Sequence, residues 1–167
     1  MNFRIVEREG ISEAIAESAQ VFFSGDRAEA ERHFQTHPHG DSTTLLAFLG
    51  EELVGILTIR WQSQYPPFRE RNIPLIHYIE VKWERRGQGI GNALMAEAER
   101  FASARVDRLG ICVGLFDAYG PAQRLYVKRG FVPDGRGACQ GAEPLREGQI
   151  VAIDHELLIW LVKCLAV

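Results

Sequence analysis

The chain has 167 residues, of which 46% are hydrophobic, and a formal net charge of −3. This length predicts a single domain over residues 1–167, and the hydrophobic fraction is enough for a substantial core. The negative charge offers no bulk attraction to nucleic acid or to an anionic membrane. The apolar run 157–162 is far too short to span a bilayer, and the first residues lack the apolar core of a signal peptide. The three cysteines are widely spaced and indicate no disulfide framework, so a soluble cytoplasmic domain is expected.

Strand and helix patterns alternate in the first half of the chain. Apolar and polar residues alternate over 3–8, and helical spacing follows over 11–22, with Ser12 as a candidate N-cap. Asp26 and Glu29 resemble a capping box for a second helix that ends near His37-Pro38. Residues 45–49 and 53–61 are predicted as two strands that a hairpin turn at 50–52 joins. A loop over 62–72 and a further strand over 73–82 follow.

The second half begins with a glycine-rich turn and a long helix that reaches residue 106. A strand is predicted over 109–116, and a helix opens at Gly120-Pro121 and ends at Gly130. Then follow a short strand at 131–132, a glycine-rich loop over 134–148, a segment at 150–153 that can pair with a neighbour, and a closing strand at 157–163. This order predicts an α/β fold, with a mixed sheet and helices on its faces.

Three glycines in five residues, Gly87, Gly89 and Gly91, join the strand 73–82 to the long helix. The first amides of a helix lack internal partners and carry partial positive charge, and glycine lets an anion approach them closely. The turn therefore predicts a phosphate site. The spacing fits neither G-x-G-x-x-G nor G-x-x-x-x-G-K-[ST], which disfavours dinucleotide and nucleoside-triphosphate loops.

Two motifs in this chain resemble the signatures of the GNAT superfamily of N-acetyltransferases. Residues Arg86 to Gly91 fit R/Q-x-x-G-x-G/A, the acetyl-CoA signature of that family. About one strand further on, A-x-x-L-Y-x-x-x-G-F is matched by Ala122, Leu125, Tyr126, Gly130 and Phe131. The resemblance implies a mixed, mostly antiparallel central sheet of about six or seven strands, with helices on both faces and a splay between the fourth and fifth strands.

The resemblance also implies which residues hold acetyl-CoA, the cosubstrate, with no metal involved. The pyrophosphate would be bound by the backbone amides of Arg86, Gly87, Gln88, Gly89, Ile90, Gly91 and Asn92. Ile79 and Val81 match the backbone positions that hold the pantetheine arm. Whether the side chains of Arg85 and Arg86 add charge to this site is open. Tyr119 stands where many members have asparagine, and Trp83 stands where they have proline.

The reaction implied is direct attack by a primary amine on acetyl-CoA in a ternary complex. The amine must lose a proton, an oxyanion needs a donor, and the departing thiolate needs a proton. Tyr126 matches the family tyrosine that supplies that last proton. The base is open between Glu80, His77, a water chain and a residue elsewhere, because positions 77 and 80 of a regular strand face opposite sides unless a bulge intervenes. For Glu80, a simple ion pair with an arginine is the alternative.

The acceptor amine cannot be identified from the motifs. Tyr65, Phe68 and Trp61 are candidates for its walls, and ordinary packing is at least as good an explanation for each. Glu29, Glu31 and Glu70 are candidates for attracting a cationic amine. The histidines of 37–39 lack a third ligand nearby, so no metal site is predicted. A non-catalytic acyl-CoA-binding or regulatory module on the same fold is the alternative function, and the strand 157–162 is a candidate for a homodimer edge.

Overall fold

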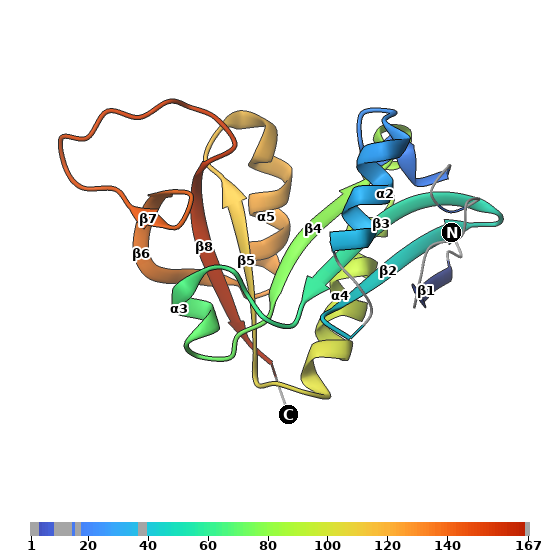
Figure 1. Cartoon of the computed structure of the whole chain (residues 1–167), viewed down its shortest axis with the longest axis horizontal. Coiled ribbons are helices and arrows are strands. Elements are labelled where there is room, and N and C mark those ends of the chain that lie inside the picture. Colours follow the sequence, from blue (N-terminus) through green and yellow to red (C-terminus); the bar gives the residue numbers. More distant parts are fainter. Residues whose placement is uncertain (1–3, 9–14, 16–17, 37–39, 166–167) are drawn as a thin grey trace. The chain divides into compact units, whose positions relative to one another are not determined.

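The computed structural model describes residues 4–8, 15, 18–36 and 40–165. The chain divides into two compact units. The first unit contains residues Met1–Trp61 and Ile76–Phe101, and the second contains Gln62–Leu75 and Ala102–Val167. Figure 1 shows the elements of each unit along the chain.

The first unit is built on four strands, in the order β1-β2-β3-β4. Their bounds are Arg4–Arg8, Ser42–Leu49, Glu52–Arg60 and Leu75–Val81. β1 and β2 are antiparallel, as are β2 and β3, and a register shift between Ala47 and Phe48 interrupts the second pair. Gly50 (φ 60°) takes the left-handed conformation that the tight turn between β2 and β3 requires.

Two longer helices cover opposite faces of β3 in this unit. On one face, α2 (Arg27–Thr36) buries Ala30 in a cluster with Ile56. On the other, α4 (Ile90–Ser103) lies over Gly55, where an added Cβ would come within 3.0 Å of two helix side chains. Because Gly55 and Ile56 are neighbours, strand alternation accounts for the two faces. The 3₁₀ helices of this unit, η1 and η2, span Gln20–Phe22 and Trp83–Arg85.

The second unit has the strand order β5-β8-β6-β7. The bounds are Arg108–Gly114, Leu157–Cys164, Val132–Gln140 and Glu143–Pro144. The helices are α3 (Pro66–Arg69), η3 (Asp117–Tyr119) and α5 (Gly120–Lys128). β8 pairs antiparallel with β5 on one side and with β6 on the other. β8 is therefore an interior strand, and the prediction that 157–162 lies at a dimer edge is wrong.

An aromatic cluster forms the core of the second unit. The rings of Tyr65 and Trp160 stack with centroids 3.9 Å apart, and Phe68 meets both edge-on. The Tyr65 hydroxyl donates to Asp134 Oδ2 at 2.8 Å. Burial, followed by this neighbouring carboxylate, raises the pKa of Tyr65 above its ordinary value. Tyr65 and Phe68 are thus core residues of this unit.

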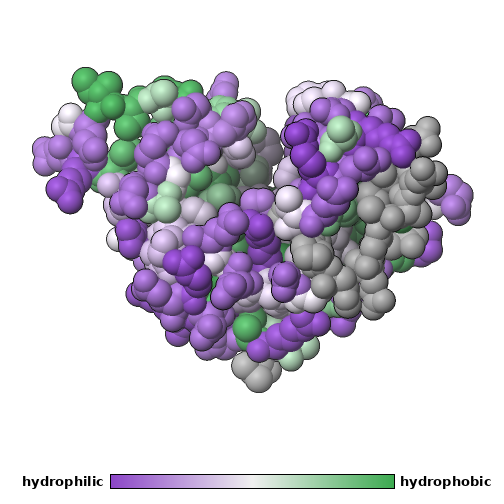
Figure 2. All heavy atoms as spheres, viewed as in Figure 1, coloured by the Kyte–Doolittle hydropathy of each residue, from purple (hydrophilic) through white to green (hydrophobic). Residues whose placement is uncertain are grey.

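The predicted mixed α/β fold, mostly antiparallel, is confirmed, although eight strands are present among the described residues where about six or seven are predicted. Three local predictions are wrong. The loop 62–72 contains α3, and β6 reaches Gln140 through a stretch predicted as loop. Residues 150–153 form no strand, and Ile150 is 99% exposed. Figure 2 shows apolar atoms gathered over this β7–β8 loop.

Some predictions fall outside the described residues, namely the Ser12 cap, the helix end at 37–38 and the histidines of 37–39. In the described part of the chain, no helix is long and apolar enough to cross a membrane. Nor does that part contain a group of three His, Cys, Asp or Glu side chains placed to hold a metal ion.

Candidate active site

The glycine turn lies in the first unit, between η2 and the start of α4. Gly87 and Gly89 have φ of 75° and 86°, in the left-handed region that other residues rarely adopt. A Cβ added at either glycine would meet nothing within 4 Å. These two glycines are therefore required by the backbone path, and the space beside them is open to a ligand.

The start of α4 has the features of an anion-binding helix terminus. The Ala93 amide is bonded to Gly89 O at 3.0 Å, and the amides before it belong to the first turn, which has no intrahelical acceptors. No acidic side chain lies in that turn, so no carboxylate of the helix competes for its positive end. Ile90 and Leu94 are buried and contact Gly55 of β3, which fixes the helix start against the sheet.

The two arginines before the glycines are already engaged with carboxylates. Arg85 Nη2 donates to Glu52 Oε2 at 2.7 Å. Arg86 forms an ion pair with Glu80, donates through Nε to Val81 O at 3.2 Å, and lies 4.6 Å over the Trp83 ring. Both guanidinium groups are therefore bonded to residues of the strands, Arg85 to β3 and Arg86 to β4.

Both candidate bases lie on β4, with different surroundings. His77 is exposed, and Glu80 is the ion-pair partner of Arg86. The arginine partner that sequence analysis gives as the alternative role of Glu80 is therefore present. Between them, Tyr78 donates its hydroxyl to Phe22 O at 2.6 Å and stacks on Phe23. Burial, followed by the nearby Glu80 charge, raises the pKa of Tyr78, so Tyr78 is a protonated packing residue.

The residues of the second motif lie in the second unit. Tyr126 of α5 is buried, and its ring centroid is 6.3 Å from that of Phe131. Gly130 has φ 87° and follows the helix end, as the motif predicts. The chain reverses there, and the Phe131 amide donates to Tyr126 O at 3.0 Å.

Tyr119, which stands where many members of the family have asparagine, is held by contacts with His155 and Phe116. Its hydroxyl bonds to His155 Nδ1 at 2.9 Å, and its ring meets Phe116 edge-on. A Cβ at Gly114 would come within 2.3 Å of that ring. The end of β5 is thus shaped to accept an aromatic side chain at position 119.

The candidate acceptor residues are divided between the two units. Tyr65 and Phe68 are in the core of the second unit. Trp61 donates through Nε1 to Thr43 Oγ1 at 3.1 Å, and Glu31 pairs with Arg27 on the exposed face of α2. Glu52 falls in the predicted hairpin turn and has no predicted role, although its side chain holds two cations next to the glycine turn.

Comparison with known proteins identifies a family for this chain. The family model described as Acetyltransferase (GNAT) family matches residues 10–131. No curated protein matches the sequence at a significant level.

Several solved structures share the fold. An acetyltransferase of the GNAT family from Streptococcus pneumoniae is 23% identical, with a TM-score of 0.63 over 96% of this chain and 99% of that one. The ribosomal-protein-S18-alanine N-acetyltransferase from Escherichia coli is 13% identical, with a TM-score of 0.70 over 99% and 96%. Aminoglycoside 6'-acetyltransferase type Ii is 17% identical, with a TM-score of 0.69 over 98% and 97%. At these identities the likeness shows the fold alone, and it is the match over residues 10–131 that shows that the chain belongs to the GNAT family of acetyltransferases.

Proposed function

We propose that this protein transfers the acetyl group of acetyl-CoA to a primary amine by direct attack in a ternary complex. The observation that carries this proposal is the start of α4, where two left-handed glycines lead into a first turn without acidic side chains. Such a terminus fits a pyrophosphate. The backbone amides of residues 86–92 would hold it, and the backbone of Ile79 and Val81 would hold the pantetheine arm. Acetyl-CoA, when bound, supplies the acetyl group as a thioester.

His77 is the residue we assign to taking the proton from the amine. Its side chain is exposed on β4, and an imidazole titrates near neutral pH, which suits a general base. Glu80 is the less suitable candidate because its carboxylate already accepts a charge-assisted hydrogen bond from Arg86. We therefore assign Glu80 to holding Arg86 in place.

Tyr126 is the residue we assign to protonating the sulfur as it leaves. A phenol has a reference pKa near 10, high enough to hold its proton at pH 7 and to give it to a thiolate. The assignment rests on the A-x-x-L-Y-x-x-x-G-F motif. The residue itself is buried on α5.

The test is release of free CoA thiol across a panel of amines, with acetyl-CoA as donor. The panel includes an aminoglycoside and a peptide that begins with alanine, because the names of two proteins of the same fold contain an aminoglycoside and the alanine of a ribosomal protein. For an amine that is turned over, Tyr126→Phe and His77→Gln should each lower kcat by about 100-fold or more, the usual size of an acid or base contribution. Glu80→Gln should lower it by less than about 10-fold.

Other outcomes would redirect the assignments. An unchanged kcat in Tyr126→Phe would remove that residue from the chemistry. A larger loss in Glu80→Gln than in His77→Gln would make Glu80 the base. Binding of acetyl-CoA with no turnover of any amine would favour the non-catalytic acyl-CoA-binding module, for which Tyr119 in place of asparagine is the supporting feature.

A further inference from the structure

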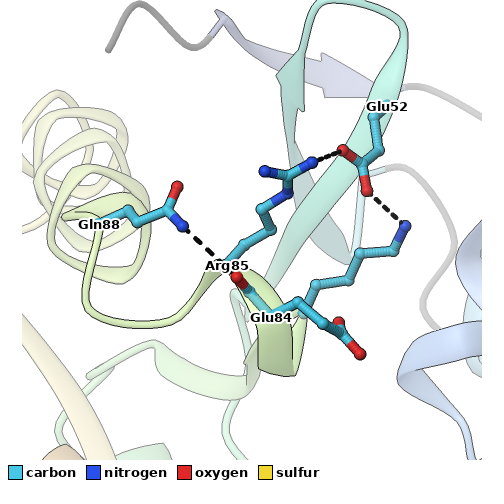
Figure 3. A network of polar contacts seen from close by, with 5 residues as sticks. Glu52, Glu84, Arg85 and Gln88 are labelled. Atoms are coloured by element: carbon cyan, nitrogen blue, oxygen red, sulfur yellow. Dashed lines mark hydrogen bonds and ion pairs between the residues drawn. The ribbon is translucent and has the colours of Figure 1, made fainter.

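One carboxylate is shared by two cations at the entrance to the glycine turn. Glu52 begins β3, Lys82 directly follows β4, and Arg85 ends η2. Glu52 Oε1 accepts from Lys82 Nζ at 2.9 Å, and Oε2 accepts from Arg85 Nη2 at 2.7 Å. Figure 3 shows the carboxylate of Glu52 meeting the side chain of Arg85. We call this pair of contacts the Glu52 brace; it ties β3 to both ends of η2.

Further contacts fix the same stretch of backbone. The Lys82 amide donates to Val54 O at 3.0 Å, which places the start of η2 beside β3. On the far side of the glycines, Ile90 and Leu94 rest on Gly55. The glycine turn is therefore attached to β3 before and after Gly87 and Gly89. Between these attachments the Arg86 side chain bonds to Glu80 and to Val81 O, and the Gln88 side chain donates to Glu84 O at 3.4 Å (Figure 3).

Each of the three cationic side chains that precede the glycines has a carboxylate partner. Lys82 and Arg85 share Glu52, and Arg86 pairs with Glu80. The Lys82 ammonium, followed by the Arg85 guanidinium, holds the pKa of Glu52 below its ordinary value. A depressed pKa means that the charged brace is complete above the ordinary pKa of a glutamate and is lost as the pH falls through the folded value. At neutral pH the brace is intact.

We propose that Glu52 is a positioning residue for pyrophosphate binding: it acts through Lys82 and Arg85 to set the direction of the backbone amides of the glycine turn. The inference rests on the proposed use of acetyl-CoA. It implies that the phosphates are bound by backbone, while Lys82 and Arg85 stabilise the turn. Because both ion pairs are partly exposed, removing the charge should leave the protein folded.

The test compares Glu52→Gln with Glu51→Gln, its exposed neighbour in the hairpin turn. Two acetyl donors are used, acetyl-CoA and S-acetylpantetheine, which lacks the pyrophosphate. Glu52→Gln should raise KM for acetyl-CoA by about 3- to 10-fold, with kcat within about twofold of wild type. It should leave KM for S-acetylpantetheine unchanged, and Glu51→Gln should match wild type with both donors. Glu52→Asp, which keeps the charge, should recover part of the loss.

Two kinetic results and one binding result would overturn the proposal. An unchanged or lower KM for acetyl-CoA in Glu52→Gln would show that the turn needs no brace, or that freed Lys82 and Arg85 bind phosphate themselves. An equal rise with both donors would indicate a general structural effect.

Direct titration with CoA and with pantetheine separates this proposal from the enzymatic one, because it needs no turnover. A wild-type protein that binds CoA but transfers nothing refutes only the reaction, whereas one that does not bind CoA refutes both.

Discussion

Gly110 of β5 occupies a position where a side chain has no room. A Cβ there would lie 2.2 Å from Phe68 Cε2 and 2.5 Å from Cδ2. Phe68 cannot move away easily, because it is buried against Tyr65 and Trp160. We expect Gly110→Ala to lower the free energy of unfolding by about 1–3 kcal/mol, the usual cost of overpacking a core. Urea denaturation followed by tryptophan fluorescence measures this.

Gly120 provides the matched control, because it is also a glycine of the second unit but has open space around its Cα. A Cβ at Gly120 meets nothing within 4 Å, and its φ of −51° is ordinary for a helix. Gly120→Ala should therefore be neutral or stabilise the protein by up to about 1 kcal/mol. Equal losses in the two variants would mean that contact with Phe68 is not the cause.

At this scale the sequence predicts backbone requirements better than side-chain partners. The sequence places Gly87 and Gly89 in a turn before the long helix, and both have positive φ. An ion pair between Glu80 and an arginine is predicted only as the alternative to its role as base, and the sequence does not say which arginine reaches it. The contact of Glu52 with Lys82 and Arg85 has no sequence signal, because it joins residues about thirty positions apart through the pairing of strands.

Among the elements, α2 depends on a single side chain at its start. Asp26 Oδ1 accepts from the amides of Ala28 at 2.8 Å and Glu29 at 3.2 Å, which satisfies two amides of the first turn. Asp26→Ala should cost about 1 kcal/mol of unfolding free energy. Asp26→Asn keeps an oxygen at the same place and should cost much less. If both variants lose equally in urea denaturation, the negative charge near the helix terminus, and not the cap, is the main contribution.

The elements that sequence analysis missed lack a regular pattern. β6 reads as a loop because Gly135 and Gly137, at φ of 95° and 75°, fall within it. They accompany a register shift between Pro133 and Ala138, and such irregular strands lose the alternation that identifies a strand. α3 has only four residues, too few for helical periodicity to show. In contrast, α4 has fourteen residues with a buried face, and its position is predicted well.

At the scale of the whole molecule, length predicts one domain, and within the chain the contacts form two compact units. The sequence contains no sign of this division because no linker marks it. Two of the crossings fall inside regular elements, since β4 begins at Leu75 and α4 ends at Ser103. Where a boundary runs through a strand or a helix, composition does not change and periodicity continues.

Ligand binding should raise the thermal stability of the folded protein, and the glycine turn offers a specific control. At a concentration of acetyl-CoA about 100 times Kd, the expected stabilisation is about 2.7 kcal/mol, or roughly 5–10 °C in Tm for a chain of this size. Gly89→Val should abolish the shift, because a branched side chain at φ 86° both strains the turn and fills the space open to a phosphate.

Gly148 is the matched position, with φ 84° and open surroundings in the β7–β8 loop of the second unit. Gly148→Val introduces the same kind of strain, so its Tm without ligand should fall by a similar amount, while its shift with acetyl-CoA should equal that of wild type. Differential scanning fluorimetry over a series of acetyl-CoA concentrations measures both quantities. Loss of the shift in both variants would trace the effect to general destabilisation, and an unchanged shift in Gly89→Val would place the phosphate site away from α4.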